Sequence, residues 1–166
     1  DVSSNLPLVI IDSFGSAIND SVLAPSHTLV IDVDQQSGRA KITDAAQMSN
    51  FSGVKKRGSS SLGFPKNNYA VELWDENRED VDREVLDMPE ESDWILHGPY
   101  SDKSLMRNAL SYEWSNAIGR YAVRTRYVEL YLNTNGGEVA SNDYHGVYVL
   151  MEKIKRNPAR VPITRI

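Results

Sequence analysis

The sequence contains no cysteine, so disulfides, thiolate chemistry and cysteine-type zinc sites are excluded together. No apolar run approaches the ~20 residues that a membrane-spanning helix needs, and we therefore expect no membrane span. A basic excess is also absent, since the formal net charge is -5, which argues against a nucleic-acid partner. The three histidines, His27, His97 and His145, lack metal-ligand spacing, so we expect no metal site and interpret them as surface or satisfied polar positions.

The 166 residues are enough for one compact domain with a buried core. A content of 40% hydrophobic and 25% charged residues is ordinary for a globular protein. The charge is uneven, because basic residues gather at 55–57 and 153–160 and an acidic stretch, 75–91, lies between them. Two interpretations stay open: all three groups are solvated surface, or one basic group meets a phosphate.

Apolar patterns predict a series of β-strands. The predicted strands are residues 6–11, 28–33, 39–43, 69–74, 93–97, 127–132 and 144–151. Within 127–132, Val128, Leu130 and Leu132 alternate with polar or aromatic residues and should share one face of the sheet.

One helix is predicted, from a cap at Ser101 or Asp102 to about Gly119. An apolar residue recurs at every fourth position and builds one stripe along it. The stripe consists of Met106, Leu110, Trp114 and Ile118. The strands and this helix predict an α+β fold, a mainly antiparallel sheet with one long packed helix.

Four segments, in this order and spacing, carry the most specific signal. They are 57–69 (RGSSSLGFPKNNY), 88–100 (MPEESDWILHGPY), 102–108 (DKSLMRN) and 144–154 (YHGVYVLMEKI), the last preceded by 126–133 (RYVELYLN). Together they resemble the spore-coat protein H (CotH) kinase family over residues ~51–166.

The resemblance implies the small lobe and hinge of an atypical protein kinase that binds ATP with Mg²⁺. It implies transfer of phosphate to Ser/Thr of secreted, surface or coat proteins, and a location that is extracellular, at the cell surface or in the spore coat. Residues 1–166 would form a single, partial CotH kinase-like domain, because the family's catalytic and metal-binding acidic residues are expected beyond Ile166. No catalytic residue is therefore expected here, and the chain alone should be inactive.

Residues 57–66 have the composition of a phosphate cradle, in which backbone N–H groups and serine hydroxyls approach an anion. The candidate nucleotide-binding residues here are Arg57, Gly58, Ser59, Ser60, Ser61 and Lys66. By resemblance, Lys66 takes the role of the phosphate-pairing strand lysine, with Arg57 as second choice. The segment is neither a Walker A loop nor the G-x-G-x-x-G loop of ordinary kinases. A flexible Gly/Ser-rich hairpin loop is the structural alternative.

Further candidates lie at the predicted helix. Asp102, Arg107 and Asn108 supply a carboxylate, a guanidinium and an amide that could hold a metal-bound phosphate or a partner loop. In the structural alternative, Asp102 is an N-cap and Arg107 its salt-bridge partner. If the helix plays the part of a kinase regulatory helix, Glu113 could face Lys66.

By resemblance, residues 144–154 are the last strand of the small lobe and run into the hinge. Backbone groups around Met151, Glu152 and Lys153 could then hydrogen-bond an adenine. The alternative is an ordinary core strand, and both can hold. A small lobe without its partner lobe would expose the hinge face, so we expect self-association or marginal stability of this fragment.

Two other functions stay open. The first is a non-catalytic extracellular interaction module of a coat, an envelope or a polysaccharide-degrading assembly, because the catalytic half is absent from the sequence. The second is carbohydrate binding through Trp74, Trp94 and exposed tyrosines, although aromatic residues in strands more often belong to a core.

Overall fold

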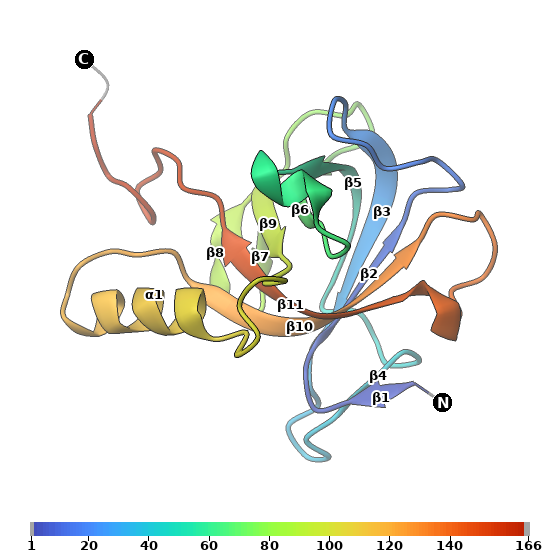
Figure 1. The fold of residues 1–166 in the computed structure, drawn as a ribbon, viewed down its shortest axis with the longest axis horizontal. Helices are drawn as coiled ribbons and strands as arrows, with labels where there is room; N and C mark the ends of the chain where they lie inside the picture. Colours follow the sequence, from blue (N-terminus) through green and yellow to red (C-terminus); the bar gives the residue numbers. More distant parts are fainter. Residues whose placement is uncertain (1, 165–166) are drawn as a thin grey trace.

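The computed structural model describes residues 2–164 and consists mainly of β-strands (Figure 1). The strands are β1 (Ser3–Ser4), β2 (Leu8–Asp12), β3 (Ala24–Ile31), β4 (Ala40–Lys41), β5 (Met48–Arg57), β6 (Asn68–Trp74), β7 (Arg83–Val85), β8 (Met88–Glu91), β9 (Asp93–His97), β10 (Thr125–Asn133) and β11 (Tyr144–Glu152). The helical elements are α1 (Arg107–Ala117) and two 3₁₀ turns, η1 (Ser60–Gly63) and η2 (Ser141–Asp143).

Seven strands close into a barrel in the order β10-β11-β9-β6-β5-β3-β2. Neighbouring strands are antiparallel except β2 and β10, which run parallel, with Val9 beside Leu130, and so close the ring. Closure gives each barrel strand two hydrogen-bonded neighbours, which removes the exposed edges of an open sheet. The other four strands form two small ribbons, β1–β4 and β7–β8.

The barrel interior is filled by side chains that alternate with outward-facing ones along each strand. Val128, Leu130 and Leu132 all lie in this core, which confirms the face predicted for them. Thr28 and Ser52 are also buried, and their hydroxyl oxygens lie 2.8 Å apart, so each hydroxyl has a partner.

Two apolar patches outside the barrel are covered by neighbouring elements. The β1–β4 side of the molecule packs on Leu8, Ile10 and Tyr131. At the other end, Tyr112 of α1 packs against a small cluster that includes Ile95. Figure 1 shows the two covers well apart, with α1 at the left and the β1–β4 ribbon at the bottom of the view.

The predicted α+β fold with one long packed helix was wrong. The protein is 42% strand and 11% helix, and its main sheet closes on itself instead of forming an open kinase-like lobe. Barrel side chains fill their own core, so only a small outer patch remains for the helix to cover. Because β2 pairs with β10 across most of the sequence, no local pattern revealed this closure.

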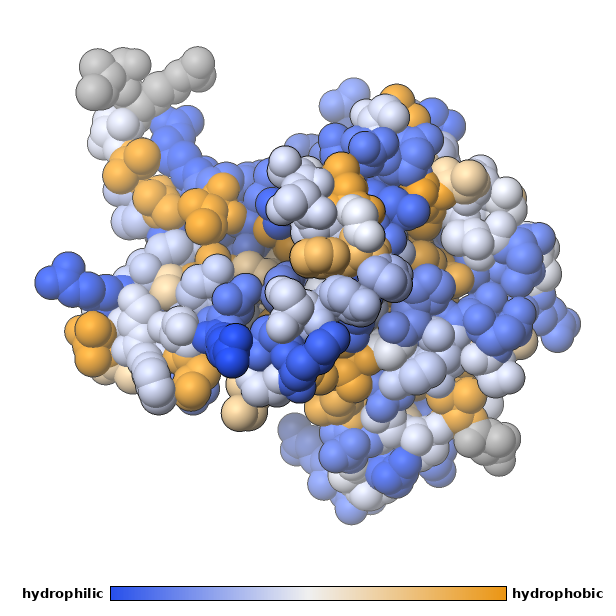
Figure 2. Space-filling view, in the orientation of Figure 1, coloured by the Kyte–Doolittle hydropathy of each residue, from blue (hydrophilic) through white to orange (hydrophobic). Residues whose placement is uncertain are grey.

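The helix itself also differs from the prediction. It has 11 residues and begins at Arg107, because Leu105 adopts a φ of 60°, outside helical geometry. The predicted apolar stripe faces solvent, with Trp114 64% and Ile118 73% exposed. Figure 2 shows apolar side chains at the surface at the left of the molecule, where α1 lies. None of the helices within residues 2–164 has the length and apolarity needed to cross a bilayer.

Candidate functional site

One end of the barrel brings the matched segments together. Strand β5 ends at Arg57, which pairs with Asn68 at the start of β6. Strand β9 ends at His97, beside Val149 of β11. Lys66, in the connection between η1 and β6, reaches the same place and donates a hydrogen bond to the carbonyl oxygen of Val147. We call Arg57, Lys66 and His97 the basic cluster.

Asn68 organises this end through its side-chain amide. Its Oδ1 lies 2.8 Å from Nδ1 of His97 and accepts a second hydrogen bond, of 2.9 Å, from the N–H of Gly98. Its Nδ2 donates to the hydroxyl of Ser61 over 3.3 Å. The amide thus ties β9 to the Gly/Ser-rich turn.

The ring of His97 is held between two amides. Nε2 lies 3.2 Å from Nδ2 of Asn108 and so accepts, while Nδ1–H donates to Asn68. This arrangement requires the neutral ring. Burial lowers the pKa of His97, and the positive charges of Arg57 and Lys66 lower it further.

Lys66 is half-buried, and burial lowers its pKa. Its ammonium lies 4.7 Å from the centre of the Tyr148 ring, a cation–π distance. Gly98 makes this approach possible, because a Cβ there would lie only 2.9 Å from the Tyr148 ring and 3.0 Å from the Lys66 stem. The lysine is therefore positioned by packing on several sides.

Of the loop candidates, Gly58, Ser59, Ser60 and Ser61 lie between β5 and the end of η1, next to this cluster. Apart from Ser61, which is half-buried, they are exposed. The loop is therefore accessible to solvent and adjoins the basic cluster at Arg57, and its role as a phosphate cradle stays a prediction.

The helix candidates divide between two roles. The carboxylate of Asp102 accepts hydrogen bonds from Ser104 and from the backbone N–H of Arg107. The N-cap position of α1 is nevertheless Met106 and not Asp102, as the structural alternative had it. The Arg107 side chain is 80% exposed, and its Nε lies 3.7 Å from Oδ1 of Asp102.

The other two helix candidates lie in different surroundings. The side-chain amide of Asn108 contacts His97 of the basic cluster. Glu113 lies instead over a hollow of about 390 Å³ shared with Arg124, and none of the ion pairs within residues 2–164 joins it to Lys66.

The hinge candidates lie toward the other end of β11, five residues beyond Val147, or ~17 Å along a strand. Several of their backbone groups are engaged. Met151 pairs with both Thr125 and Ile95. The N–H of Glu152 donates to the carbonyl of Arg124, and the carbonyl of Lys153 accepts from Arg160 over 2.7 Å.

Charges around these residues form a second group, which we call the ionic cluster. It consists of Glu91, Asp93, Glu152, Arg124, Lys153, Lys155 and Arg160. Lys155 bridges Glu91 at 2.7 Å and Asp93 at 2.8 Å. Arg160 is buried beside Glu152 and over the ring of Trp94. The basic residues predicted at 153–160 are thus largely used in internal ion pairs.

Within residues 2–164, no three His, Asp or Glu side chains gather in a way that could hold a metal ion. The metal ligands that the resemblance implies were expected beyond Ile166, and that expectation stays a prediction.

Sequence reasoning missed Asn68 and His97 as members of the site, although both lie in the matched segments. The feature of the sequence that could have identified these two residues is their position at the ends of strands. Asn68 opens β6, and His97 closes the neighbouring β9 just before Gly98-Pro99. Antiparallel pairing brings two such ends together.

The family model for CotH kinase protein matches residues 54–164 of this chain. The match covers most of the chain and includes all four segments, so the chain belongs to the CotH kinase family, as the sequence predicted. That family is associated with the spore coat. A search among curated proteins found no match.

Proposed function

We propose that the basic cluster binds the phosphates of ATP and that this chain is the nucleotide-binding part of a protein kinase. The proposed acceptors are Ser/Thr residues of extracellular or coat proteins. The observation that supports this best is a pair of unneutralised cations, Arg57 and Lys66, beside the neutral ring of His97. None of the ion pairs within residues 2–164 includes Arg57, Lys66 or His97. Such a group attracts an anion.

The surrounding groups suit a phosphate. An ammonium has three donors, and Lys66 gives one to Val147, which leaves others for phosphate oxygens. Charge-assisted hydrogen bonds of this kind are about twice as strong as neutral ones. The hydroxyls of Ser59 and Ser60 add further donors on the same surface.

Titration calorimetry with ATP and Mg²⁺ tests the proposal. Lys66→Met keeps the length of the stem and removes the charge, so ATP affinity should fall about tenfold or more, or ~1.4 kcal/mol. Lys41→Met, at an exposed position on β4, is the matched control and should leave affinity unchanged. Absence of ATP binding, or equal affinity in both variants, would contradict the proposal.

A second candidate is a non-catalytic module that docks an anionic partner through the same cluster. The hydrogen bonds made by the N–H of Glu152 and the carbonyl of Lys153 favour it, because those two groups are not free to recognise adenine. Tripolyphosphate discriminates between the two. If it binds more weakly than ATP, the base is recognised and the nucleotide site is supported; if it binds equally, the docking module is.

A further inference from the structure

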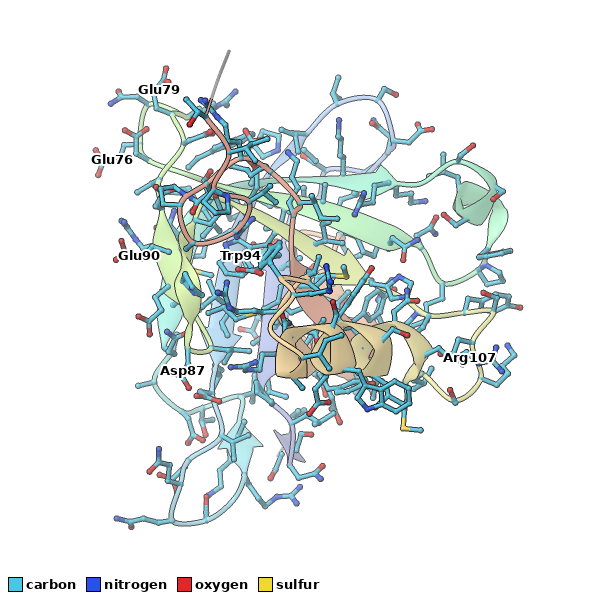
Figure 3. All side chains as sticks on the ribbon, turned by 90° about the vertical axis from the view of Figure 1, so that its left-hand side faces the viewer. Glu76, Glu79, Asp87, Glu90, Trp94 and Arg107 are labelled. Atoms are coloured by element: carbon cyan, nitrogen blue, oxygen red, sulfur yellow. The ribbon has the colours of Figure 1, made fainter. Side chains whose placement is uncertain are left out.

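A second candidate site lies at the opposite end of the same two strands. Phe51 of β5 pairs with Trp74 of β6, six residues from the Arg57–Asn68 pair at the basic cluster, or ~20 Å along the strands. Figure 3 shows Glu76, just after Trp74 in the chain, and Arg107, beside the basic cluster, on opposite sides of the molecule. The two sites are therefore separate.

Two hollows adjoin this aromatic pair. One has a volume of about 440 Å³ and includes His27, Asn77 and Arg83. The other has a volume of about 210 Å³ and includes Phe14 and Arg78. Both are lined in addition by Phe51, Trp74, Asp75 and Glu76. The four shared residues make the two hollows neighbours, and we call the two together the aromatic groove.

The aromatic pair is firmly held. A Cβ at Gly53 would lie 2.2 Å from the indole of Trp74, so the ring rests directly on the backbone of β5. The Asn50 amide donates to the carbonyl oxygens of both Trp74, at 2.6 Å, and Phe51, at 2.9 Å. His27 meets the Phe51 ring edge-on at 5.3 Å. Phe51 nevertheless remains 49% exposed.

Phe14 adds an outlier at the second hollow. Its φ is 52°, in the left-handed region that bulky side chains avoid, and its ring is 59% exposed. Its N–H donates to the Asp12 carboxylate over 2.8 Å, which holds this turn. Strained residues of this kind concentrate at ligand-binding sites, and burial of the ring cannot explain this one.

The charges of the aromatic groove are balanced. Asp75 and Glu76 contribute two carboxylates, and Arg78 and Arg83 contribute two guanidinium groups. The groove thus offers donors and acceptors in equal measure, which selects against a strongly charged ligand. A ligand with many hydroxyls and apolar C–H faces uses both the aromatic rings and the polar rim.

We propose that the aromatic groove binds a neutral oligosaccharide, with sugar rings stacked on Phe51 and Trp74 and hydroxyls bonded to the polar rim. Two adjoining hollows accommodate at least two sugar units. Trp94 takes no part, because it is buried and its indole N–H donates to the Glu91 carbonyl. Part of the groove, including His27 and Phe51, precedes the family match at residue 54. Binding here does not depend on the proposed nucleotide site.

Affinity electrophoresis and calorimetry test this with neutral hexasaccharides of glucose, xylose and N-acetylglucosamine. At least one should bind, and Phe51→Ala should weaken it tenfold or more while ATP affinity stays unchanged. Trp114→Ala, which removes an exposed tryptophan on α1, is the control and should have no effect. Because Trp74 also packs on Gly53, Trp74→Phe is preferred to a smaller residue.

Salt provides a second criterion. Binding of a neutral sugar should be nearly constant between about 0.1 M and about 1 M salt, since only charge interactions are screened. Failure of all three hexasaccharides to bind, or equal binding by wild type and Phe51→Ala, would overturn the proposal. Binding of a charged peptide in the groove, with a steep salt dependence, would overturn it as well.

Discussion

Two groups of basic residues have opposite surroundings in the protein. The basic cluster, in which Arg57 and Lys66 carry the charge and His97 is neutral, has no carboxylate partner within the described residues. Lys153, Lys155 and Arg160 of the ionic cluster each lie beside a carboxylate. The former can attract a ligand. The latter is already neutralised by Glu91, Asp93 and Glu152 and holds the carboxy-terminal segment on the barrel.

The comparison shows why local charge is a poor guide to an anion site. Either group could have met a phosphate, judged from the sequence alone. The two groups differ in whether carboxylates from a distant part of the chain reach them. Glu91 and Asp93, which pair with Lys155, are about 60 residues away from it along the chain. Only the pairing of β9 with β11 brings them together.

Breaking the ionic cluster should have the largest effect. Arg160 is 1% exposed, lies 3.5 Å from Glu152 and stacks over Trp94. Arg160→Ala would leave a buried carboxylate with less compensation, which costs ~3–5 kcal/mol in the free energy of unfolding. Urea denaturation measures this loss of stability.

The control is Arg156→Ala, at an exposed position in the same segment. It should change the free energy of unfolding by less than ~0.5 kcal/mol. Equal stability of the two variants would refute a structural role for Arg160.

Acid should weaken the same cluster. Burial opposes ionisation of Glu91 and Asp93, but hydrogen bonds and positive charges, chiefly from Lys155 for Glu91 and from Lys153 and Lys155 for Asp93, outweigh it and lower both pKa values. A lowered folded pKa means that the stabilisation is present above the unfolded pKa, about 4, and is lost as the pH falls through the folded pKa.

Urea denaturation on either side of about pH 4 detects this loss. Asp93→Asn, which cannot ionise, should show a shallower decline than wild type over the same range. Identical declines would mean that Asp93 does not contribute.

We expect His97 of the basic cluster to cause a smaller change in the free energy of unfolding, at a higher pH than the acid effect. The pKa of His97 is lowered, so the unfolded state takes up a proton near pH ~6.5 while the folded state does not. Stability should therefore fall as the pH drops below ~6.5 and level off below the folded pKa. His97→Gln should reduce this slope. The pKa of His27 is also lowered, by burial, so part of the slope should remain.

The control is Trp114→Ala, at an exposed position on α1, which changes no titrating group and should leave the slope unchanged. A slope that is the same in His97→Gln as in wild type would show that the half-buried ring is not neutral in the folded state.

Individual strands were predictable because each has its own local pattern. The range 93–97 was predicted as it occurs, and 69–74 differs from β6 by one residue. Barrel closure was not predictable, since it depends on the pairing of Leu130 with Val9 from distant parts of the chain. The helix failed for a related reason: its four-residue apolar repeat is real, but the closed barrel offers it little surface to bury.

The site was predictable only where the family motifs carried it. Lys66 and Arg57 lie together as a phosphate site would require, and that role remains a prediction. His97 was interpreted as a surface or satisfied polar position, and both of its ring nitrogens do have partners. The sequence does not show that these partners are Asn68 and Asn108. The backbone around Met151 looked free in the sequence, yet strands on both sides occupy it.

The most direct test compares ATP affinity after removing one lysine from each group. Lys66→Met should weaken ATP binding about tenfold or more, whereas Lys155→Met should preserve it and lower the free energy of unfolding instead. The same fall in ATP affinity in both variants, or a fall in Lys155→Met alone, would contradict the division between a ligand-binding and a structural group of cations.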